Sequence, residues 1–173
     1  MFVDECGTHT SLAPVYGYSS KGERLNLSIP RNRGPNTTSL LASMTIKGMG
    51  LSMAVNGTTT AEVFEAYLKH FLVPALEAGQ VVVMDRLPAY KPGRVRELIE
   101  RRGCELLYLT SYSPDYNPIE EAFSKIKEIL RRSAARTREA LVEGMGRALS
   151  AISSQDARRF FEHAGYHPTD QLL

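Results

Sequence analysis

The sequence predicts an α/β domain in which a mixed sheet is flanked by helices. Three observations lead to this fold class. Short apolar segments of strand length alternate with longer segments whose apolar residues recur at helical spacing. A glycine-centred hairpin pattern precedes the first helical segment, so the sheet should contain antiparallel as well as parallel strands. At 173 residues, 43% of them hydrophobic, the chain is long enough to form one core of ordinary size.

The chain opens with an apolar segment, residues 1–3, which indicates a buried strand with Asp4 and Glu5 at its end. This strand is short, because central strands usually have about five or six residues. We therefore expect the sequence to be a fragment, a downstream reading frame or one part of a protein completed by frameshifting. Glu5 either contacts the residues of a ligand site without touching the ligand itself, or is a solvated acid.

The next segment should form the antiparallel part of the sheet. Residues 12–36 mix alternating apolar residues with glycines and prolines, which predicts a short hairpin and an exposed loop containing Arg31 and Arg33. Residues 38–47 and 51–55 then read as two antiparallel strands around a glycine turn.

A helical period follows over residues 61–78. Thr59 and Glu62 match a capping box at its start. Pro74 should kink or divide the helix at its last turn, because proline lacks the N–H that a helix interior needs.

The central part of the chain alternates strand and helix. Residues 81–84 form a continuous apolar run rich in valine, which predicts a buried parallel strand that ends at Asp85. A helix over residues 92–102, capped by Gly103, and a strand over residues 106–109 follow.

A proline-rich turn then leads into another helix. Pro114 and Pro118 restrict the backbone, and Pro118 suits the first helical turn, which places Glu120 in that turn. A carboxylate held in this way is positioned for chemistry. The alternative is that Glu120 and Glu121 only complement the positive end of the helix dipole.

Two polar residues, Asp115 and Asn117, precede this helix. Side chains of these types cap turns and helix starts, so we expect them to hold Glu120 in place. A direct metal-binding role is the alternative for both.

Two further amphipathic helices are predicted over residues 137–152 and 154–163. We therefore divide the chain into a core, residues 1–135, and a C-terminal helical extension of the same domain, residues 136–173.

The composition is typical of a globular protein inside the cell. A formal charge of +2 and a pI near 8.6 allow a polyanionic partner without requiring one. Cys6 and Cys104 match no metal-ligand spacing and form no disulfide framework, which indicates a reducing compartment. No signal peptide and no apolar segment of membrane-spanning length is visible, so we expect a cytoplasmic protein without a membrane partner.

Three acids occupy equivalent places in the predicted topology. Asp4 and Asp85 end strands, and Glu120 opens the helix after the last strand. Ligands bind beyond the carboxyl ends of parallel strands, so the three side chains should meet at one edge of the sheet. Carboxylates brought together repel one another unless a cation neutralises them. The sequence therefore predicts a site for Mg²⁺, or Mn²⁺, with two ions able to support an in-line displacement at phosphorus.

Three segments carry a resemblance to a known family. Residues 2–5 (Phe-Val-Asp-Glu), 83–91 (Val-Met-Asp-Arg-Leu-Pro-Ala-Tyr-Lys) and 112–120 (Tyr-Ser-Pro-Asp-Tyr-Asn-Pro-Ile-Glu) resemble the catalytic segments of DDE transposases of the mariner superfamily, in its bacterial insertion-sequence branch. Residues 86–119, 34 in number, separate the second and third acids, the spacing of the Asp-Asp-34-Glu subgroup. The resemblance extends to His163-Ala-Gly-Tyr166 near the end of the chain.

This resemblance implies a ribonuclease H-like fold and the catalytic domain of an insertion-sequence transposase. Asp4, Asp85 and Glu120 would be its catalytic residues and metal ligands. It further implies metal-dependent DNA strand cleavage and strand transfer at transposon ends, with double-stranded DNA as transposon end and target. Family members recognise their ends through an N-terminal helix-turn-helix domain, and the active complex is expected to be a homodimer at the bacterial nucleoid.

The second segment departs from the family pattern. Arg86 replaces an asparagine, and Tyr90 replaces a histidine. Arg86 would either pair with Asp85 or contact a phosphate, and tyrosine cannot act as a neutral imidazole does near pH 7. Two alternatives therefore stay open: an inactive or truncated remnant that only binds DNA or a partner, and a stand-alone nuclease that cuts DNA without joining it.

Several cations are candidates for contacts with the DNA backbone, which supplies affinity without sequence information. The alternative for each is a solvated surface charge. The candidates are Lys91, Arg31, Arg33, Lys125, Lys127, Arg131 and Arg132.

Overall fold

The computed structural model describes residues 1–26, 28, 37–85, 92–110 and 114–167. Within them, five strands form one sheet in the order β3-β2-β1-β4-β5. The β1–β2 and β2–β3 pairs are antiparallel, whereas β4 pairs in parallel with both β1 and β5. The sheet is therefore mixed, as the sequence predicts. The strands are β1 (Phe2–His9), β2 (Thr37–Thr45), β3 (Gly48–Asn56), β4 (Val81–Asp85) and β5 (Glu105–Leu109).

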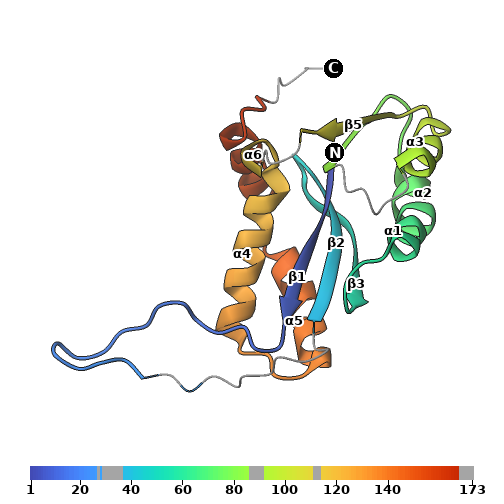
Figure 1. The fold of residues 1–173 in the computed structure, drawn as a ribbon. Helices are drawn as coiled ribbons and strands as arrows, with labels where there is room; N and C mark the ends of the chain where they lie inside the picture. The colour runs from blue at the N-terminus through green and yellow to red at the C-terminus, as the bar shows by residue number, and fades with distance from the viewer. Residues whose placement is uncertain (27, 29–36, 86–91, 111–113, 168–173) are drawn as a thin grey trace.

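Helices cover both faces of this sheet (Figure 1). One layer contains α1 (Ala61–Tyr67), the π-helical η1 (Leu68–Leu72), α2 (Val73–Ala75) and α3 (Pro92–Glu100). The other contains the 3₁₀ turn η2 (Pro114–Tyr116), α4 (Pro118–Ser133), α5 (Arg138–Ser150) and α6 (Ser154–His163). In the described part of the chain, no helix has the length and apolar character needed to cross a membrane.

The sheet has a separate core on each face. Phe2 and Cys6 of β1 pack with Phe123 of α4 and Phe161 of α6, whereas Val3 belongs to the core under α1 and α3. This division follows from the alternation of side chains along a strand. The helices after residue 136 therefore pack on the same face of the sheet as α4.

The first strand differs from its prediction. β1 has eight residues, and Asp4 is the third of them instead of marking the strand end. Residues 2–9 all pair with β2, and Cys6 and Thr8 are buried beyond the acid. The strand extends beyond its apolar residues because it pairs along its whole length with β2, which is distant in sequence.

The loop after β1 also differs. Residues 10–26 and 28 contain no strand; a turn joins Ser20 and Glu23, and Gly17 approaches the side chain of Leu25. The rest of the predicted hairpin, with Arg31 and Arg33, lies outside the described residues.

The hairpin of β2 and β3 is present, but its turn is shifted. The turn lies at residues 46–47, and Gly48 opens β3 with φ +125°, a conformation that favours glycine. The predicted capping box is displaced by one residue: the Thr60 side chain accepts a hydrogen bond from the Val63 N–H, so Thr60 and not Thr59 caps α1. Pro74 lies in α2, where the predicted long helix is already divided by η1.

Candidate active site

The first two acids lie where the parallel part of the sheet ends. Parallel pairing of β1 with β4 stops at Val3 and Met84, so Asp4 and Asp85 each follow the last pair. Asp85 is the last residue of β4, opposite Leu109 at the end of β5. Asp4 therefore reaches the carboxyl edge of the parallel strands even though β1 continues beyond it.

The third acid approaches this edge from the start of α4. Pro118 opens the helix and is buried, and the Glu120 N–H donates to the Asn117 carbonyl at 3.0 Å. The buried face of α4, which includes Phe123 and Ile126, faces β1 and the core. This packing leaves Glu120 exposed in the first turn, where its carboxylate is available to a ligand.

Asn117 joins the first acid to the third. It occupies the cap position of α4, but its side chain does not cap the helix. Instead it is buried, with 4% of its surface exposed, and its Nδ2 donates to Asp4 Oδ2 at 2.8 Å. The other oxygen of Asp4, Oδ1, accepts the Glu5 N–H at 2.7 Å. The predicted capping role of the Asn117 side chain is therefore wrong, and its bond fixes the Asp4 carboxyl group.

The carboxyl group of Asp4 is affected both by its burial and by the other two acids. Burial is the main cause that raises the pKa of Asp4 to about 7, and the Glu120 and Asp85 carboxylates raise it further. The hydrogen bonds from Glu5 and Asn117 lower it only in part. Partial burial also raises the pKa of Asp85. Negative charge at this edge is thus incompletely compensated by the protein.

The donor set suits a hard divalent cation. Asp4, Asp85 and Glu120 offer only carboxylate oxygens, the ligands that Mg²⁺ and Mn²⁺ take. Within the described residues, no group of three or more His, Cys, Asp or Glu side chains is arranged as a metal site. Two neighbouring segments, residues 86–91 with Arg86, Tyr90 and Lys91, and residues 111–113, lie outside the described residues.

A cleft of about 280 Å³ opens beside Glu120. His163, at the end of α6, lines it together with Glu121, and His163 Nδ1 lies 2.6 Å from Glu121 Oε1. The hydrogen bond and charge of Glu121 raise the pKa of His163. The residues around His163 resemble the family motif. They do not predict the pairing with Glu121, which lies 42 residues away in the sequence. The cleft is lined by Asp115, Asn117, Glu120, Glu121, Ser124 and His163.

Tyr166 connects the C-terminal segment to the same region. Its hydroxyl donates to the Tyr116 carbonyl at 2.9 Å, and its ring lies 5.1 Å, centroid to centroid, from the Phe2 ring. Phe161 completes this group of rings, 5.3 Å from Phe2. Tyr166 therefore touches β1 two residues before Asp4 and the turn that ends immediately before Asn117.

Three of the candidate DNA-contacting cations have partners inside the chain, and one of them, Arg132, pairs with Glu128 on the surface of α4. Lys125 Nζ lies 2.8 Å from Asp156 Oδ2. Lys127 lies beside the thiol of Cys6, whose pKa is raised by burial. Lys125 and Lys127 are therefore not free surface charges.

Comparison with known proteins gives a family and a fold. A family profile described as DDE superfamily endonuclease matches residues 1–142. No curated protein sequence matches the chain.

Solved structures of one transposase share the fold. The Mos1 transposase paired-end complex with left transposon end has a TM-score of 0.75 at 18% identity, covering 93% of this chain and 50% of that chain. The Mos1 strand transfer complex has a TM-score of 0.71 at 18% identity with the same coverage, 93% and 50%. The Mos1 mariner paired end complex with Mn has 0.65 at 16% identity, covering 93% and 51%. The chain thus spans about half the length of these proteins. Their similarity to the five-stranded sheet and its helices confirms the predicted ribonuclease H-like fold.

Proposed function

This chain belongs to the DDE superfamily endonuclease family, and on that premise we propose that it is the catalytic domain of a mariner-type transposase. It would cleave one DNA strand at the end of a mobile element and join the resulting 3′-hydroxyl to target DNA. The observation that carries the proposal is the buried Asn117 amide, which ties Asp4 to the start of the helix that bears Glu120. A surface acid that only complements a helix dipole needs no such connection.

Asp4, Asp85 and Glu120 would hold the divalent cation, Mg²⁺ or Mn²⁺, and we propose two ions. When bound, the metal supplies a lowered pKa for an attacking water or hydroxyl and neutralises charge on the phosphate. Burial, together with repulsion from the Glu120 and Asp85 carboxylates, raises the pKa of Asp4, and a cation bound there would stabilise its charged form. Of the structures named above, one contains Mn.

The residues of the chain itself orient the reacting groups. The hydrogen bonds from Asn117 and Glu5 hold both oxygens of Asp4. The buried face of α4 and the rigid Pro118 entry set the direction of Glu120. The cleft beside Glu120 would receive the phosphate that is cleaved, with His163 at its rim. Such fixed geometry favours a reaction that consists mainly of positioning and charge stabilisation.

The partners we propose are double-stranded DNA, as transposon end and as target, and a second copy of the chain in the active complex. Terminal-repeat recognition would come from a helix-turn-helix domain on the N-terminal side or in an upstream frame. A bacterial insertion sequence is the proposed source of the element, and the nucleoid its place of action.

A second candidate is a transposase remnant that binds DNA without cutting it. Arg86 and Tyr90, which replace the asparagine and histidine of the family pattern, favour this reading. The two candidates differ in metal-dependent chemistry, not in fold.

The deciding experiment measures cleavage of a labelled duplex that carries the element's ends, by the chain joined to its N-terminal DNA-binding domain. We expect cleavage with Mg²⁺ or Mn²⁺, none with EDTA, and loss of cleavage in Asp85→Ala. Glu105→Ala, an exposed acid at the opposite end of β5, is the matched control and should cleave normally. Absence of cleavage by the unaltered protein, or equal cleavage by Asp85→Ala, would contradict the enzyme and favour the remnant.

A further inference from the structure

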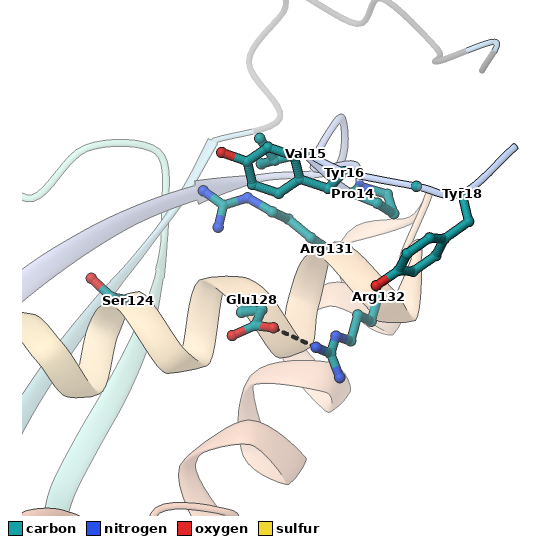
Figure 2. A pocket seen from close by; sticks show the side chains of 9 residues that line it. Pro14, Val15, Tyr16, Tyr18, Ser124, Glu128, Arg131 and Arg132 are labelled. Atoms are coloured by element: carbon teal, nitrogen blue, oxygen red, sulfur yellow. Dashed lines mark hydrogen bonds and ion pairs between the residues drawn. The ribbon is translucent and has the colours of Figure 1, made fainter. Parts of the chain in front are cut away.

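A second groove, of about 760 Å³, lies between the loop after β1 and the outer face of α4 (Figure 2). One wall is the loop, which carries two tyrosines, and the other is α4, which carries two arginines. The residues that line the groove are Pro14, Val15, Tyr16, Gly17, Tyr18, Ser124, Glu128, Arg131 and Arg132.

The loop wall presents aromatic rings to solvent. Tyr16 is 91% exposed and Tyr18 is as exposed as in an extended chain, at 102%. One exposed aromatic ring is ordinary, but two on the same wall of a groove form a surface on which flat, apolar groups can stack.

The helix wall presents positive charge that can be used for binding. Arg131 makes no hydrogen bond or ion pair with another residue in the described part of the chain. Arg132 pairs with Glu128, but both side chains are mostly exposed, and such surface pairs contribute little. A phosphate can therefore take the place of Glu128 at low cost.

The base of the loop is tied to the chain beyond α4. Arg136 donates from Nη1 to the carbonyls of Thr10, at 3.0 Å, and Leu12, at 2.9 Å. Thr10 is buried, and Leu12 packs against the core under α4. These contacts fix the start of the loop beside the segment that follows α4.

The groove continues from the active-site cleft. Ser124 lines both of them. At a rise of about 1.5 Å per residue, Arg131 lies roughly 17 Å along α4 from Glu120.

We propose that this groove binds an unpaired stretch of the DNA substrate, roughly 17 Å along α4 from the phosphate that is cleaved. Arg131 and Arg132 contact its phosphates, and Tyr16 and Tyr18 stack on its bases. The strand is single because the faces of bases within a duplex are covered by their neighbours and cannot meet a tyrosine ring. The proposal rests on the proposed function for the identity of the ligand as DNA.

Binding is tested with the 173-residue chain and a fluorescent oligothymidylate of about 15 nucleotides, by anisotropy in EDTA. In Tyr16→Leu/Tyr18→Leu, which keeps apolar area but removes both rings, we expect affinity to fall roughly 100-fold, or about tenfold per ring. Tyr16→Phe/Tyr18→Phe keeps the rings and should bind as the unaltered chain does.

The arginines are tested by salt dependence. Arg131→Ala/Arg132→Ala should weaken binding and reduce the slope of log affinity against log salt by about 1.4, since each phosphate contact on a single strand contributes about 0.7. Lys69→Ala/Arg101→Ala removes two exposed charges from the opposite layer and is the matched control.

Two results would overturn the proposal: unchanged affinity in the leucine variant, or a groove variant that changes only the oligomeric state in light scattering, which would identify a second copy as the occupant. The assay needs no metal and no cleavage, so it separates the two proposals. A chain that cleaves nothing but binds oligothymidylate through the tyrosines disproves the transposase and keeps the groove. If the leucine variant cleaves normally and binds the strand as well as the unaltered chain, the groove proposal is disproved and the transposase is kept.

Discussion

The Asn117 amide donates a hydrogen bond of 2.8 Å to Asp4 Oδ2, and this bond joins residues 113 positions apart in the sequence. Asn117→Ala should destabilise the fold by about 1–3 kcal/mol, because it leaves a partly buried carboxyl oxygen without its donor. Metal-dependent cleavage should fall roughly 10- to 100-fold, as expected when the group that orients a metal ligand is lost. Urea unfolding and the cleavage assay measure the two effects.

A double-mutant cycle with Asp4→Ala isolates the pair. The cost of Asn117→Ala should shrink in the Asp4→Ala background, with a coupling of about 0.5–3 kcal/mol. Asn26→Ala, at an exposed asparagine in the loop after β1, should change stability by less than about 0.5 kcal/mol. Additive effects of the two substitutions would mean that Asn117 does not support Asp4.

The same pair shows which parts of the site can be predicted from sequence. The motif places Asn117 directly before a helix, and this local pattern predicts a cap. The actual partner is set by the packing of α4 along β1, which no local pattern contains. His163 and Glu121 meet for the same reason, since α6 packs against α4.

Where the stabilising signals are local, the prediction was close. α6 spans Ser154–His163 as predicted, because Ser153 and Asp156 form a capping box at its start. Where pairing decides, the prediction failed: β1 runs to His9 because β2 lies beside it. Thr59 and Thr60 carry the same capping signal, so the sequence alone could not choose between them.

Tyr166 should stabilise both segments of the candidate active site that it touches. Tyr166→Phe keeps the ring but removes the bond to the Tyr116 carbonyl, and we expect a loss of about 0.5–1.5 kcal/mol. Tyr166→Ala should cost more, because the contacts with the Phe2 and Phe161 rings are also lost. Hydrogen exchange of η2 should become faster in both variants. Tyr16→Phe, at an exposed ring, is the control, and an equal loss of stability there would refute the role of the hydroxyl.

The His163 and Glu121 pair predicts a pH effect at the rim of the cleft. Glu121 raises the pKa of His163, so the pair stabilises the fold fully below the unfolded pKa of histidine and loses that contribution as pH rises through the folded pKa. In Glu121→Gln the pKa of His163 should fall toward the usual value of about 6.5. Glu162→Gln removes a neighbouring exposed acid and should leave the titration unchanged. NMR titration of the imidazole resonances measures both, and equal shifts in the two variants would contradict the pairing.

The end of α4 offers a test of backbone conformation. Ala134 ends this helix in the left-handed region, at φ +48° and ψ +38°, which costs an L-residue with a Cβ about 1–2 kcal/mol relative to right-handed backbone. Glycine has no such cost but gains freedom in the unfolded chain, so Ala134→Gly should stabilise the protein by about 0.5–1 kcal/mol. Ala151 ends α5 with φ −83°, in the right-handed region, and Ala151→Gly should instead destabilise by about 0.5–1 kcal/mol. Urea unfolding of the two variants should give changes of opposite sign, and a destabilised Ala134→Gly would show that the helix does not end in the left-handed conformation.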